Sequence, residues 1–594
     1  MITLYPQSSA ARTVQDLSGV WDFRFQGDEG WQPIAVPASY NDQSPDPRFR
    51  NRAGIVEYRR TLTIPRCFQG LRYCLRFDAV AHSAEVFLNG SRIASHRGGF
   101  LPFEVELTEL LAPGETGVLT VEADNRIGHG TLPIGSEGDT AFFGSDNPGI
   151  PAVEAGKRRQ QERGVNRPAF DFFNYTGIQR PVRLIATPRA YIRDIALVPS
   201  VSGEVRYEVL TGGEASDAPV RVEILDADGR RAACASGAKG TVHIAAPVLW
   251  EPRPGVPYLY TARVTYGEDL YDLPFGIREV RVEGTRFLIN GKPFYFHGPA
   301  KHEDSAFRGK GLDQCLNVTD INLYHWLRAN CFRTSHYPYA EEMYRLCDRE
   351  GIVIVDETPA VGMWADEHYG WDLADYHREV LRDMIARDRN HPSVVMWSLG
   401  NEPDTDTFPD KAYDYWRPLY DLAHQLDPQD RPVTVVGCQN KYDRDRVIRS
   451  MDVVFINRYY GWYNLSGDLD AARYAFRLEL DWWAGQHKPV VLSEYGADTI
   501  AGLHGAAPEM FTEEFQVAYY RTMNACLDER DFVVGEMPWN FADFSTCQGP
   551  MRAGGNKKGL FTRDRAPKMA AHYFRDRWGE MERSGAEPEK TAEE

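Results

Sequence analysis

Residues 390–403 read Asn-His-Pro-Ser-Val-Val-Met-Trp-Ser-Leu-Gly-Asn-Glu-Pro. The run Val-Val-Met-Trp in this stretch contains no polar residue, which is typical of a parallel strand that is buried on both faces. The polar pair Asn401 and Glu402 follows, and Pro403 ends the stretch. A buried strand that places an amide and a carboxylic acid at its C-terminal end is typical of a (β/α)8 barrel, whose active sites are built at that end.

The same pattern occurs a second time. Residues 489–496 read Pro-Val-Val-Leu-Ser-Glu-Tyr-Gly, so another short apolar run ends on a glutamate, Glu494. Two carboxylic acids that flank one glycosidic bond, roughly 5 Å apart in a retaining enzyme, are what glycoside hydrolysis requires. At that distance their pKa values move apart, because ionising both groups is unfavourable, and one of them stays protonated. Position alone does not tell which of Glu402 and Glu494 is the acid.

The chain from residue 275 onward alternates buried strand runs with helical patterns, which indicates repeated βα units. The candidate strands are residues 294–297, 331–334, 352–355, 394–397, 433–436, 453–456, 490–492 and 532–535. They number eight, the count that closes this kind of barrel. We therefore predict a C-terminal TIM barrel over residues 275–594.

Residues 1–186 alternate short runs of period two, such as 19–25 and 71–77, with turn signals. Asn89-Gly90 lies between two such runs and is a strong hairpin signal, because both residues tolerate a positive φ. These features predict an antiparallel β sandwich. Within it, residues 131–169 are rich in glycine, proline and charge, and we expect them to form a long loop.

Residues 187–274 form a second β-rich segment, with strand patterns at 194–198, 220–225 and 258–264. A length below about one hundred residues suits an immunoglobulin-like β sandwich. No residue pattern in this segment indicates chemistry.

The composition disfavours several classes of partner. The formal charge of −18 argues against nucleic acid and anionic membranes. The 9 cysteines are dispersed without a CxxC pair, and the first residues do not read as a signal peptide, so we expect reduced thiols and a cytoplasmic location. No segment is apolar enough to span a bilayer, and no cluster of His, Cys and carboxylates has ligand spacing, so we expect no membrane, metal or cofactor.

If the barrel forms, the polar residues that follow the predicted strands all lie at its C-terminal end, which we call the mouth. Besides Asn401, Glu402 and Glu494, they are His336, Asp356, Glu357, Asn457, Tyr459, Tyr463, Trp539, Arg552, Asn556 and Lys558. Each of them alone has a structural explanation, since a single carboxylate or aromatic ring at a strand end often only packs. Their combination on successive strands is much harder to explain by chance.

Two longer motifs carry a family resemblance. Residues 330–338 read Asn-Cys-Phe-Arg-Thr-Ser-His-Tyr-Pro, and residues 388–402 run from Asp-Arg-Asn-His-Pro to Asn-Glu. With these motifs the chain resembles glycoside hydrolase family 2, and within it the β-glucuronidases, over nearly its whole length. The resemblance implies a jelly-roll sugar-binding domain over 1–186, an immunoglobulin-like domain over 187–274 and a catalytic TIM barrel over 275–594. It also implies a homo-oligomer, a dimer or a tetramer.

The resemblance further implies a retaining exo-β-glucuronidase that forms a covalent glycosyl-enzyme. Glu402 would be the acid/base, Glu494 the nucleophile, and Asn401 would bond the sugar 2-hydroxyl in a contact that tightens in the transition state. Asn556-Lys557-Lys558 resembles the Asn-x-Lys motif that holds the C6 carboxylate, with Asn556 and Lys558 as its ligands. The further substrate-binding positions that the family implies are Asp171, His336, Tyr459, Tyr463, Trp539 and Arg552.

The chain departs from some bacterial family members after the third predicted strand. Residues 360–371 lead quickly into a helix, where those members insert a long loop. We therefore expect an open aglycone side, lined by Trp364 and Trp371, that admits bulky glucuronides.

Two alternatives stay open. A β-galacturonidase, or another family 2 β-glycosidase such as a neutral β-galactosidase, would share the mechanism. Asn556 and Lys558 disfavour neutral sugars, but the sequence does not discriminate sugars that differ only at C4. A non-catalytic carbohydrate-binding protein is the more distant alternative, and the presence of both glutamates, Asn401 and the Asn-x-Lys motif argues against it.

Overall fold

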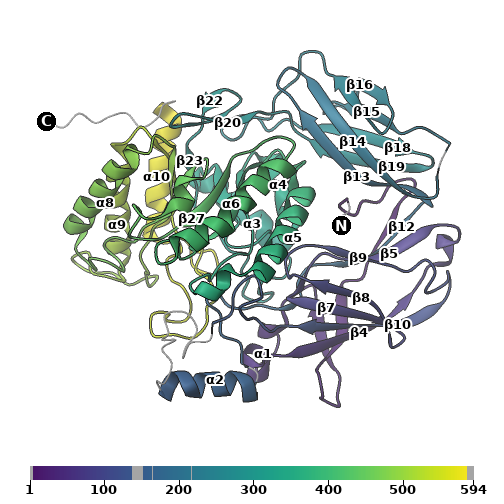
Figure 1. The fold of residues 1–594 in the computed structure, drawn as a ribbon, viewed down its shortest axis with the longest axis horizontal. Coiled ribbons are helices and arrows are strands. Elements are labelled where there is room, and N and C mark those ends of the chain that lie inside the picture. The colour runs from purple at the N-terminus through teal and green to yellow at the C-terminus, as the bar shows by residue number, and fades with distance from the viewer. Residues whose placement is uncertain (1–3, 137–150, 164, 216, 585–594) are drawn as a thin grey trace.

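The computed structural model describes residues 4–136, 151–163, 165–215 and 217–584. These residues form two β sandwiches and one barrel with surrounding helices, and both sandwiches lie on the same flank of the barrel (Figure 1). The predicted fold class, a jelly-roll sandwich followed by an immunoglobulin-like sandwich and a TIM barrel, is confirmed.

The first sandwich packs a six-stranded sheet of order β3-β2-β4-β10-β7-β8 against a four-stranded sheet of order β1-β12-β5-β9. Its elements are β1 (Thr13–Asp16), β2 (Gly19–Phe25), β3 (Gln32–Val36), α1 (Pro47–Asn51), β4 (Ile55–Thr63), β5 (Arg72–Phe77), β6 (Val80–Ala81), β7 (Ser83–Leu88), β8 (Ser91–Arg97), β9 (Phe103–Glu106), β10 (Thr116–Asp124), β11 (Gly177–Ile178) and β12 (Val182–Thr187). The predicted hairpin joins β7 to β8, with φ of 50° at Asn89 and 81° at Gly90. Both residues adopt the left-handed conformation that this turn requires.

The second sandwich packs a sheet of order β13-β14-β17 against one of order β16-β15-β18-β19. Its strands are β13 (Ala190–Pro199), β14 (Glu204–Gly213), β15 (Arg221–Leu225), β16 (Arg231–Ser236), β17 (Lys239–His243), β18 (Tyr260–Tyr266) and β19 (Asp269–Phe275). This sandwich holds the start of the stretch 390–403. Asn390 donates to the Ile195 carbonyl at 2.7 Å and accepts from the Leu197 amide at 3.0 Å.

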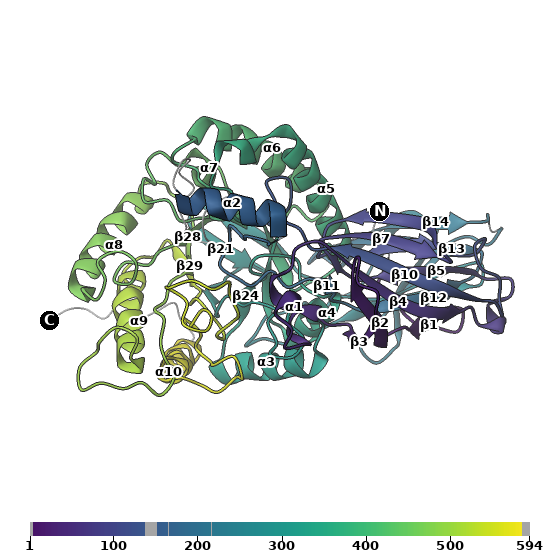
Figure 2. The same cartoon turned by 90° about the horizontal axis from the view of Figure 1, so that it is seen from below.

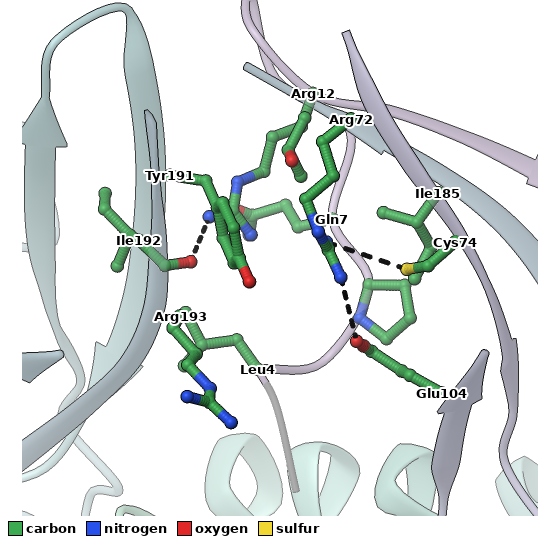
Figure 3. A pocket seen from close by; sticks show the side chains of 12 residues that line it. Leu4, Gln7, Arg12, Arg72, Cys74, Glu104, Ile185, Tyr191, Ile192 and Arg193 are labelled. Carbon is green, nitrogen blue, oxygen red and sulfur yellow. Dashed lines mark hydrogen bonds and ion pairs between the residues drawn. The ribbon is translucent and has the colours of Figure 1, made fainter. Parts of the chain in front are cut away.

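The joint between the two sandwiches is closely filled. Arg12 donates to the Ile192 carbonyl at 2.5 Å and forms an ion pair with Asp269 at 2.6 Å, and the Arg72 guanidinium lies over the Tyr191 ring (Figure 3). The hollow that these residues line holds only about 20 Å³. That volume is close to the space that one water molecule needs, so the hollow is too small for an organic ligand.

The barrel is an eight-stranded parallel sheet of order β23-β30-β29-β28-β27-β26-β25-β24. Its strands are β23 (Phe296–His297), β24 (Cys331–Arg333), β25 (Val353–Glu357), β26 (Val394–Asn401), β27 (Val433–Gly437), β28 (Val454–Asn457), β29 (Val490–Glu494) and β30 (Val533–Glu536). The Asn330 amide donates to the His297 carbonyl at 2.9 Å, and Lys301 bridges Thr334, so the first and last strands of that order meet. Each of the eight predicted strands is confirmed.

The helices of the barrel surround this sheet. They are α3 (Gln314–Leu327), α4 (Glu341–Glu350), α5 (Trp371–Asp388), α6 (Pro409–Leu426), α7 (Arg446–Arg449), α8 (Leu469–Ala484), α9 (Glu513–Asp528) and α10 (Met569–Ser584). Every residue of β26 is buried, which explains the unbroken apolar run of residues 394–397 at its start. Within the described ranges, no helix has the length and apolarity that crossing a bilayer requires.

The segment 131–169 differs from the continuous loop that we predicted. Residues 151–163 form helix α2 (Pro151–Arg163), while residues 137–150 and 164 lie outside the described residues. Proline at the first position and the run of alanine, glutamate, arginine and glutamine favour a helix. The loop was predicted because the charged residues of this run were interpreted as part of a polar connection. Figures 1 and 2 place α2 below the barrel, on the side where the yellow loops that follow β30 lie.

The segment next to α2 packs on the barrel. The Ile134 amide donates to the Val361 carbonyl at 3.1 Å, and the Ala169 amide donates to the Ile134 carbonyl at 3.1 Å. The segment between β10 and β11 therefore contacts the barrel at the loop that follows β25.

Candidate active site

Glu402 follows the last residue of β26 and has a left-handed backbone, with φ of 53°. Its amide donates to the Val436 carbonyl of the neighbouring strand β27 at 2.8 Å, which holds the turn in place. A residue other than glycine in this conformation costs of order 1 kcal/mol, and such strain is concentrated at functional sites. The backbone conformation of Glu402 is thus unfavourable, but the hydrogen bond to β27 fixes it and thereby sets the direction of the side chain.

Glu494 is the last residue of β29 and is surrounded by donors. Arg333 of β24 forms an ion pair with one of its carboxylate oxygens, and the Tyr459 hydroxyl donates to the other at 2.8 Å. The His336 Nε2 atom lies 3.8 Å from the same carboxylate. Arg333 also donates to both oxygens of Glu357 at 2.9 Å, so its buried charge is shared between two carboxylates.

Glu402 has a different environment from Glu494. The Asn457 amide, at the end of β28, donates to its Oε1 atom at 2.8 Å. Burial and, second, the charge of nearby Glu494 raise the pKa of Glu402 to about 8. Burial also raises the pKa of Glu494, but the Arg333 cation and the Tyr459 hydroxyl act against it. In this carboxyl pair, Glu402 and Glu494, the proton therefore resides on Glu402 near neutral pH.

The floor beside the carboxyl pair is polar and aromatic. The His336 ring stacks on Trp539 with centroids 5.3 Å apart and an angle of 15°, and its Nδ1 atom lies 2.8 Å from Glu357. Burial and the charge of Arg333 hold the pKa of His336 well below its usual range, so the ring is neutral. The Asn401 Oδ1 atom lies 3.4 Å from donors of both Arg333 and Asn457. These side chains present a flat ring and amide groups to the mouth.

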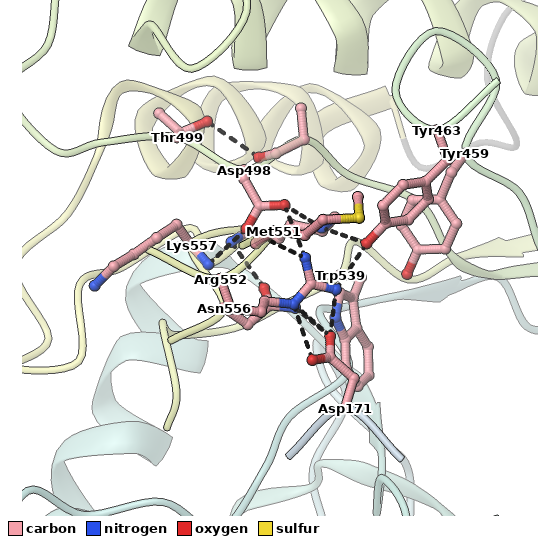
Figure 4. A network of polar contacts seen from close by, with 12 residues as sticks. Asp171, Tyr459, Tyr463, Asp498, Thr499, Trp539, Met551, Arg552, Asn556 and Lys557 are labelled. Carbon is pink, nitrogen blue, oxygen red and sulfur yellow. Dashed lines mark hydrogen bonds and ion pairs between the residues drawn. The ribbon is translucent and has the colours of Figure 1, made fainter. Parts of the chain in front are cut away.

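A second group of side chains lies next to the carboxyl pair, and we call it the loop cluster (Figure 4). It consists of Asp171, Tyr463, Asp498, Arg552, Asn556 and Lys558. The Tyr463 and Tyr459 rings meet edge to face with centroids 5.1 Å apart, and the Lys558 ammonium lies 5.8 Å from the Tyr459 ring centroid. Tyr459 therefore contacts both groups of residues.

The cations of the loop cluster are buried and bonded. Lys558 is 0% exposed, donates to the Tyr463 hydroxyl at 2.9 Å and forms an ion pair with Asp498. Arg552 donates to both oxygens of Asp171, with 2.9 Å from its Nε atom to each, and to the Tyr463 hydroxyl at 2.8 Å. The Asn556 amide donates to Asp171 at 3.0 Å. Asp171 thus ties the segment before β11 to a loop of the barrel.

The structure places every predicted site residue in one of these two groups. Asn401, His336, Tyr459 and Trp539 surround the carboxyl pair, and the other five residues belong to the loop cluster. Arg333, Asn457 and Asp498 also contact the predicted set, although no specific role was predicted for these three residues.

Two of these three residues had a signal in the sequence. Arg333 is a charge inside a buried strand run, and such a charge must meet a carboxylate. Asn457 ends a strand, as Asn401 does, and pairs in register with Glu494. Asp498 lies on the loop after Glu494, and nothing in its local sequence indicates its partner.

The side of the mouth near the loop after β25 is partly formed by the first sandwich. The side chain of Trp364 is 40% exposed there, whereas the side chain of Trp371 lies outside the described residues. Gly362 has φ of 90°, and a Cβ atom there would lie 2.9 Å from the Cβ of Ala169. Glycine at this position permits the close approach of the two segments.

The described residues include no group of three or more His, Cys, Asp and Glu side chains that is placed to hold a metal ion. The charged groups of the mouth are instead bonded to one another. The chemistry available there is proton transfer, nucleophilic attack by a carboxylate, and recognition of an anion by paired donors.

Three family models match the chain in succession. They describe the sugar binding domain of glycosyl hydrolases family 2 over residues 11–188, a glycosyl hydrolases family 2 domain over 190–278, and the TIM barrel domain of glycosyl hydrolases family 2 over 280–583.

Proteins that are similar to this chain over nearly its whole length are named β-glucuronidases. The β-glucuronidase of Paenibacillus borealis is 45% identical over 619 residues, which cover 99% of this chain and 100% of the relative. The solved structure of Faecalibacterium prausnitzii β-glucuronidase has a TM-score of 0.94 and 57% identity, covering 97% of this chain and 99% of the other. The structure of Bifidobacterium dentium β-glucuronidase complexed with coumarin-3-O-glucuronide has a TM-score of 0.93 and 51% identity, covering 97% and 98%.

Proposed function

The chain belongs to glycosyl hydrolase family 2, and from that premise we propose that it is a retaining exo-β-glucuronidase. The observation that carries this proposal is the pairing, in one barrel mouth, of an asymmetric carboxyl pair with a buried cationic loop cluster. The carboxyl pair suits glycoside hydrolysis, and the loop cluster suits an anionic sugar. The relatives that are named β-glucuronidases support the same activity.

The first step is attack by Glu494 on the anomeric carbon. A bond forms between that carbon and a Glu494 oxygen, the glycosidic bond breaks, and Glu402 gives its proton to the leaving oxygen. Arg333 and Tyr459 hold Glu494 as an anion for this attack, while the raised pKa of Glu402 keeps its proton in place. The product of this step is a covalent glycosyl-enzyme.

The second step releases the sugar. Glu402, now ionised, removes a proton from water, the water oxygen bonds to the anomeric carbon, and the bond to Glu494 breaks. Two inversions at one carbon restore the β configuration, so the enzyme retains stereochemistry. Asn401 is placed beside this centre, where it can bond the 2-hydroxyl as charge develops on the ring.

The loop cluster recognises the C6 carboxylate of the sugar. Asn556 uses one amide N–H on Asp171, and an amide carries two, so the other remains for the substrate. Lys558 supplies the cation, and the low exposure of the site strengthens its interaction with an anion. Arg552, Tyr463 and Asp171 hold these donors, while His336, Tyr459 and Trp539 form the floor under the sugar ring.

The aglycone leaves on the side of Trp364. The short segment after β25 and the exposed face of this tryptophan leave room for a bulky leaving group. Figure 2, which views the molecule from below, shows helix α2 in front of the barrel. The residues that flank this helix are hydrogen-bonded to the loop after β25, so the N-terminal domain borders this side together with the barrel.

A β-galacturonidase is the second candidate. The loop cluster suits the C6 carboxylate, which both sugars carry, and does not discriminate the C4 hydroxyl, at which they differ. The discriminating experiment is kcat/KM for the 4-nitrophenyl β-glycosides of glucuronic acid, galacturonic acid, glucose and galactose. We expect a strong preference for the glucuronide. A galacturonide preference would keep the mechanism and change the sugar, and a preference for a neutral sugar would remove the role of the loop cluster.

A covalent trap separates the enzyme from a carbohydrate-binding protein. Incubation with a 2-fluoro glucuronide that carries a good leaving group should add the mass of one sugar to the peptide that contains Glu494. Binding without any covalent adduct or turnover would support a non-catalytic role.

The setting and the assembly of the enzyme are also part of the proposal. All 9 cysteines are free, which suits the reducing cytoplasm. The family resemblance implies a dimer or a tetramer, and we propose a homo-oligomer here. Light scattering during size-exclusion chromatography measures the mass against the 67.4 kDa of one chain.

A further inference from the structure

Asp498 lies on the loop after β29, is 3% exposed and contacts three residues of the opposing loop. We infer that Asp498 is a positioning residue that fixes the buried cations of the loop cluster and thereby sets the selectivity for a C6 carboxylate. This inference rests on the proposed function and extends it, because it names the residue that prepares the cations rather than one that touches the sugar.

Asp498 contacts both side chains and the backbone of the loop that follows β30. Its Oδ2 atom forms an ion pair with Lys558 and lies 3.5 Å from Arg552 (Figure 4). Its Oδ1 atom accepts from the Lys557 amide at 2.8 Å. One carboxylate therefore fixes the position of the loop and the direction of the Lys558 ammonium.

The donor count of Lys558 explains why this direction matters. An ammonium group has three N–H bonds. Among the described residues, the hydrogen-bond acceptors of Lys558 Nζ are Asp498 and the Tyr463 hydroxyl, so one N–H bond remains. A lysine side chain is long and flexible, and two fixed acceptors remove most of that freedom before substrate binds. The remaining N–H bond is then aimed at one place.

A charge argument supports the same role. Burial raises the pKa of Asp498, but the Lys558 and Arg552 cations outweigh burial, so this pKa lies below its usual value and the group is an anion. The buried ammonium needs a fixed counter-charge when the mouth is empty, because an unpaired buried cation is strongly unfavourable. Asp498 supplies that charge.

Asp498 also connects recognition to catalysis. It stands on the loop that continues directly from Glu494, and the next residue, Thr499, donates its amide to the Lys557 carbonyl at 2.9 Å. Lys568 then donates to the carbonyls of Thr499 at 3.0 Å and Lys557 at 2.9 Å. These bonds fix the two loops to each other, so the distance from the nucleophile to the carboxylate site is set by one rigid unit.

The test is the Asp498→Asn variant, assayed on 4-nitrophenyl β-glucuronide and on 2,4-dinitrophenyl β-glucoside, whose good leaving group makes turnover of a neutral sugar measurable. We expect kcat/KM for the glucuronide to fall about 100-fold, mainly through KM, because the ammonium is no longer aimed. We expect the glucoside value to change by less than about threefold.

A double-mutant cycle shows whether Asp498 acts through Lys558. In the Lys558→Met background the ammonium is already absent, so adding Asp498→Asn should cause no further loss of the glucuronide-to-glucoside ratio. A further loss of the same size as in wild type would show that Asp498 does not act through Lys558, and would overturn the inference.

Asp427→Asn is the matched control. Asp427 is also a buried carboxylate paired with a cation, Arg431, but it precedes β27 and therefore lies at the opposite end of the barrel. This variant should lower Tm and leave the ratio of the two substrates unchanged. Equal losses on both sugars in Asp498→Asn, or an unchanged or increased ratio, would overturn the positioning role. A wild type that prefers the glucoside would instead contradict the proposed function.

Discussion

The carboxyl pair and the loop cluster share one mouth but are built on different kinds of backbone. Glu494 is the last residue of β29 and Glu402 follows β26, so the sheet of the barrel places both groups. The loop cluster comes from three loops of the barrel and from the segment of the first sandwich that contains Asp171. Reaction chemistry is thus carried by strand ends and sugar recognition by loops.

This difference divides the effects of substitutions into two classes. A change at a strand end alters the reacting atoms, so it should slow hydrolysis of every sugar. A change in the loop cluster alters the fit of one substituent, so it should change which sugar is preferred. The following experiments test that division, from the largest expected effect to the smallest.

Glu494→Ala removes the nucleophile and should lower kcat by about 10⁴-fold or more on every glycoside. Stopped assays with glucuronide and glucoside substrates measure this loss. The control is Glu536→Gln, because Glu536 also ends a barrel strand but is bonded at 2.8 Å to Arg577 of α10, one of the helices that surround the barrel. That control should lower Tm without comparable loss of turnover. Near-normal turnover in Glu494→Ala would contradict the mechanism.

Glu402→Gln removes the proton donor and should lower kcat/KM for 4-nitrophenyl glucuronide by about 10³-fold. The loss should be much smaller with a 2,4-dinitrophenyl glucuronide, because that leaving group departs without a proton. A loss that is the same for both leaving groups would show that Glu402 is not the acid. The control is the wild type, for which the two substrates should differ little.

Lys558→Met removes the buried cation and should lower kcat/KM for the glucuronide by on the order of 100-fold. The value for an activated glucoside should fall far less, because that sugar has no carboxylate for the ammonium to bind. The ratio of the two values is the measurement. If both values fell equally, the distinction between strand ends and loops would fail, and Lys558 would be a structural residue.

The carboxyl pair was predictable from the sequence for the same physical reason that makes it rigid. Strand ends of a parallel barrel meet at one face, so an apolar run that ends on Glu402 or Glu494 already locates the side chain. The partners within the loop cluster were not predictable from local pattern. Asp171 and Arg552 are bonded although 381 residues separate them, and only the packing of the first sandwich on the barrel brings them together.

Helix α2 shows the opposite failure. Its residues favour a helix locally, but their charge and the surrounding glycines and prolines led to the prediction of a loop. Arg333 lies within a family motif and no role was predicted for it, although a buried guanidinium needs carboxylate partners such as Glu357 and Glu494. The partners of individual side chains were therefore not predicted even where the strands were predicted correctly.

The pH dependence of the reaction tests the division of charge inside the carboxyl pair. Glu402 acts as an acid only while it is protonated, and its pKa is raised to about 8. The value of kcat/KM should therefore be lost as pH rises through about 8, with roughly a tenfold fall for each further pH unit. In Glu402→Gln, assayed with the 2,4-dinitrophenyl substrate, this alkaline decline should disappear. Its persistence there would assign the decline to another group.

Trp364→Ala should have the smallest effect, and it concerns the side of the mouth that neither the carboxyl pair nor the loop cluster occupies. The side chain is 40% exposed, so it can stack on an aromatic aglycone but contributes little to the barrel core. Stacking of this kind is worth about 1 kcal/mol, so kcat/KM for a coumarin glucuronide should fall about threefold to tenfold. The value for methyl glucuronide, which has no ring to stack, should not change. An equal fall for both substrates would show that Trp364 supports the loop after β25 rather than the aglycone. The opposite result, a faster reaction of the coumarin substrate, would mean that the tryptophan and helix α2 narrow this side of the mouth.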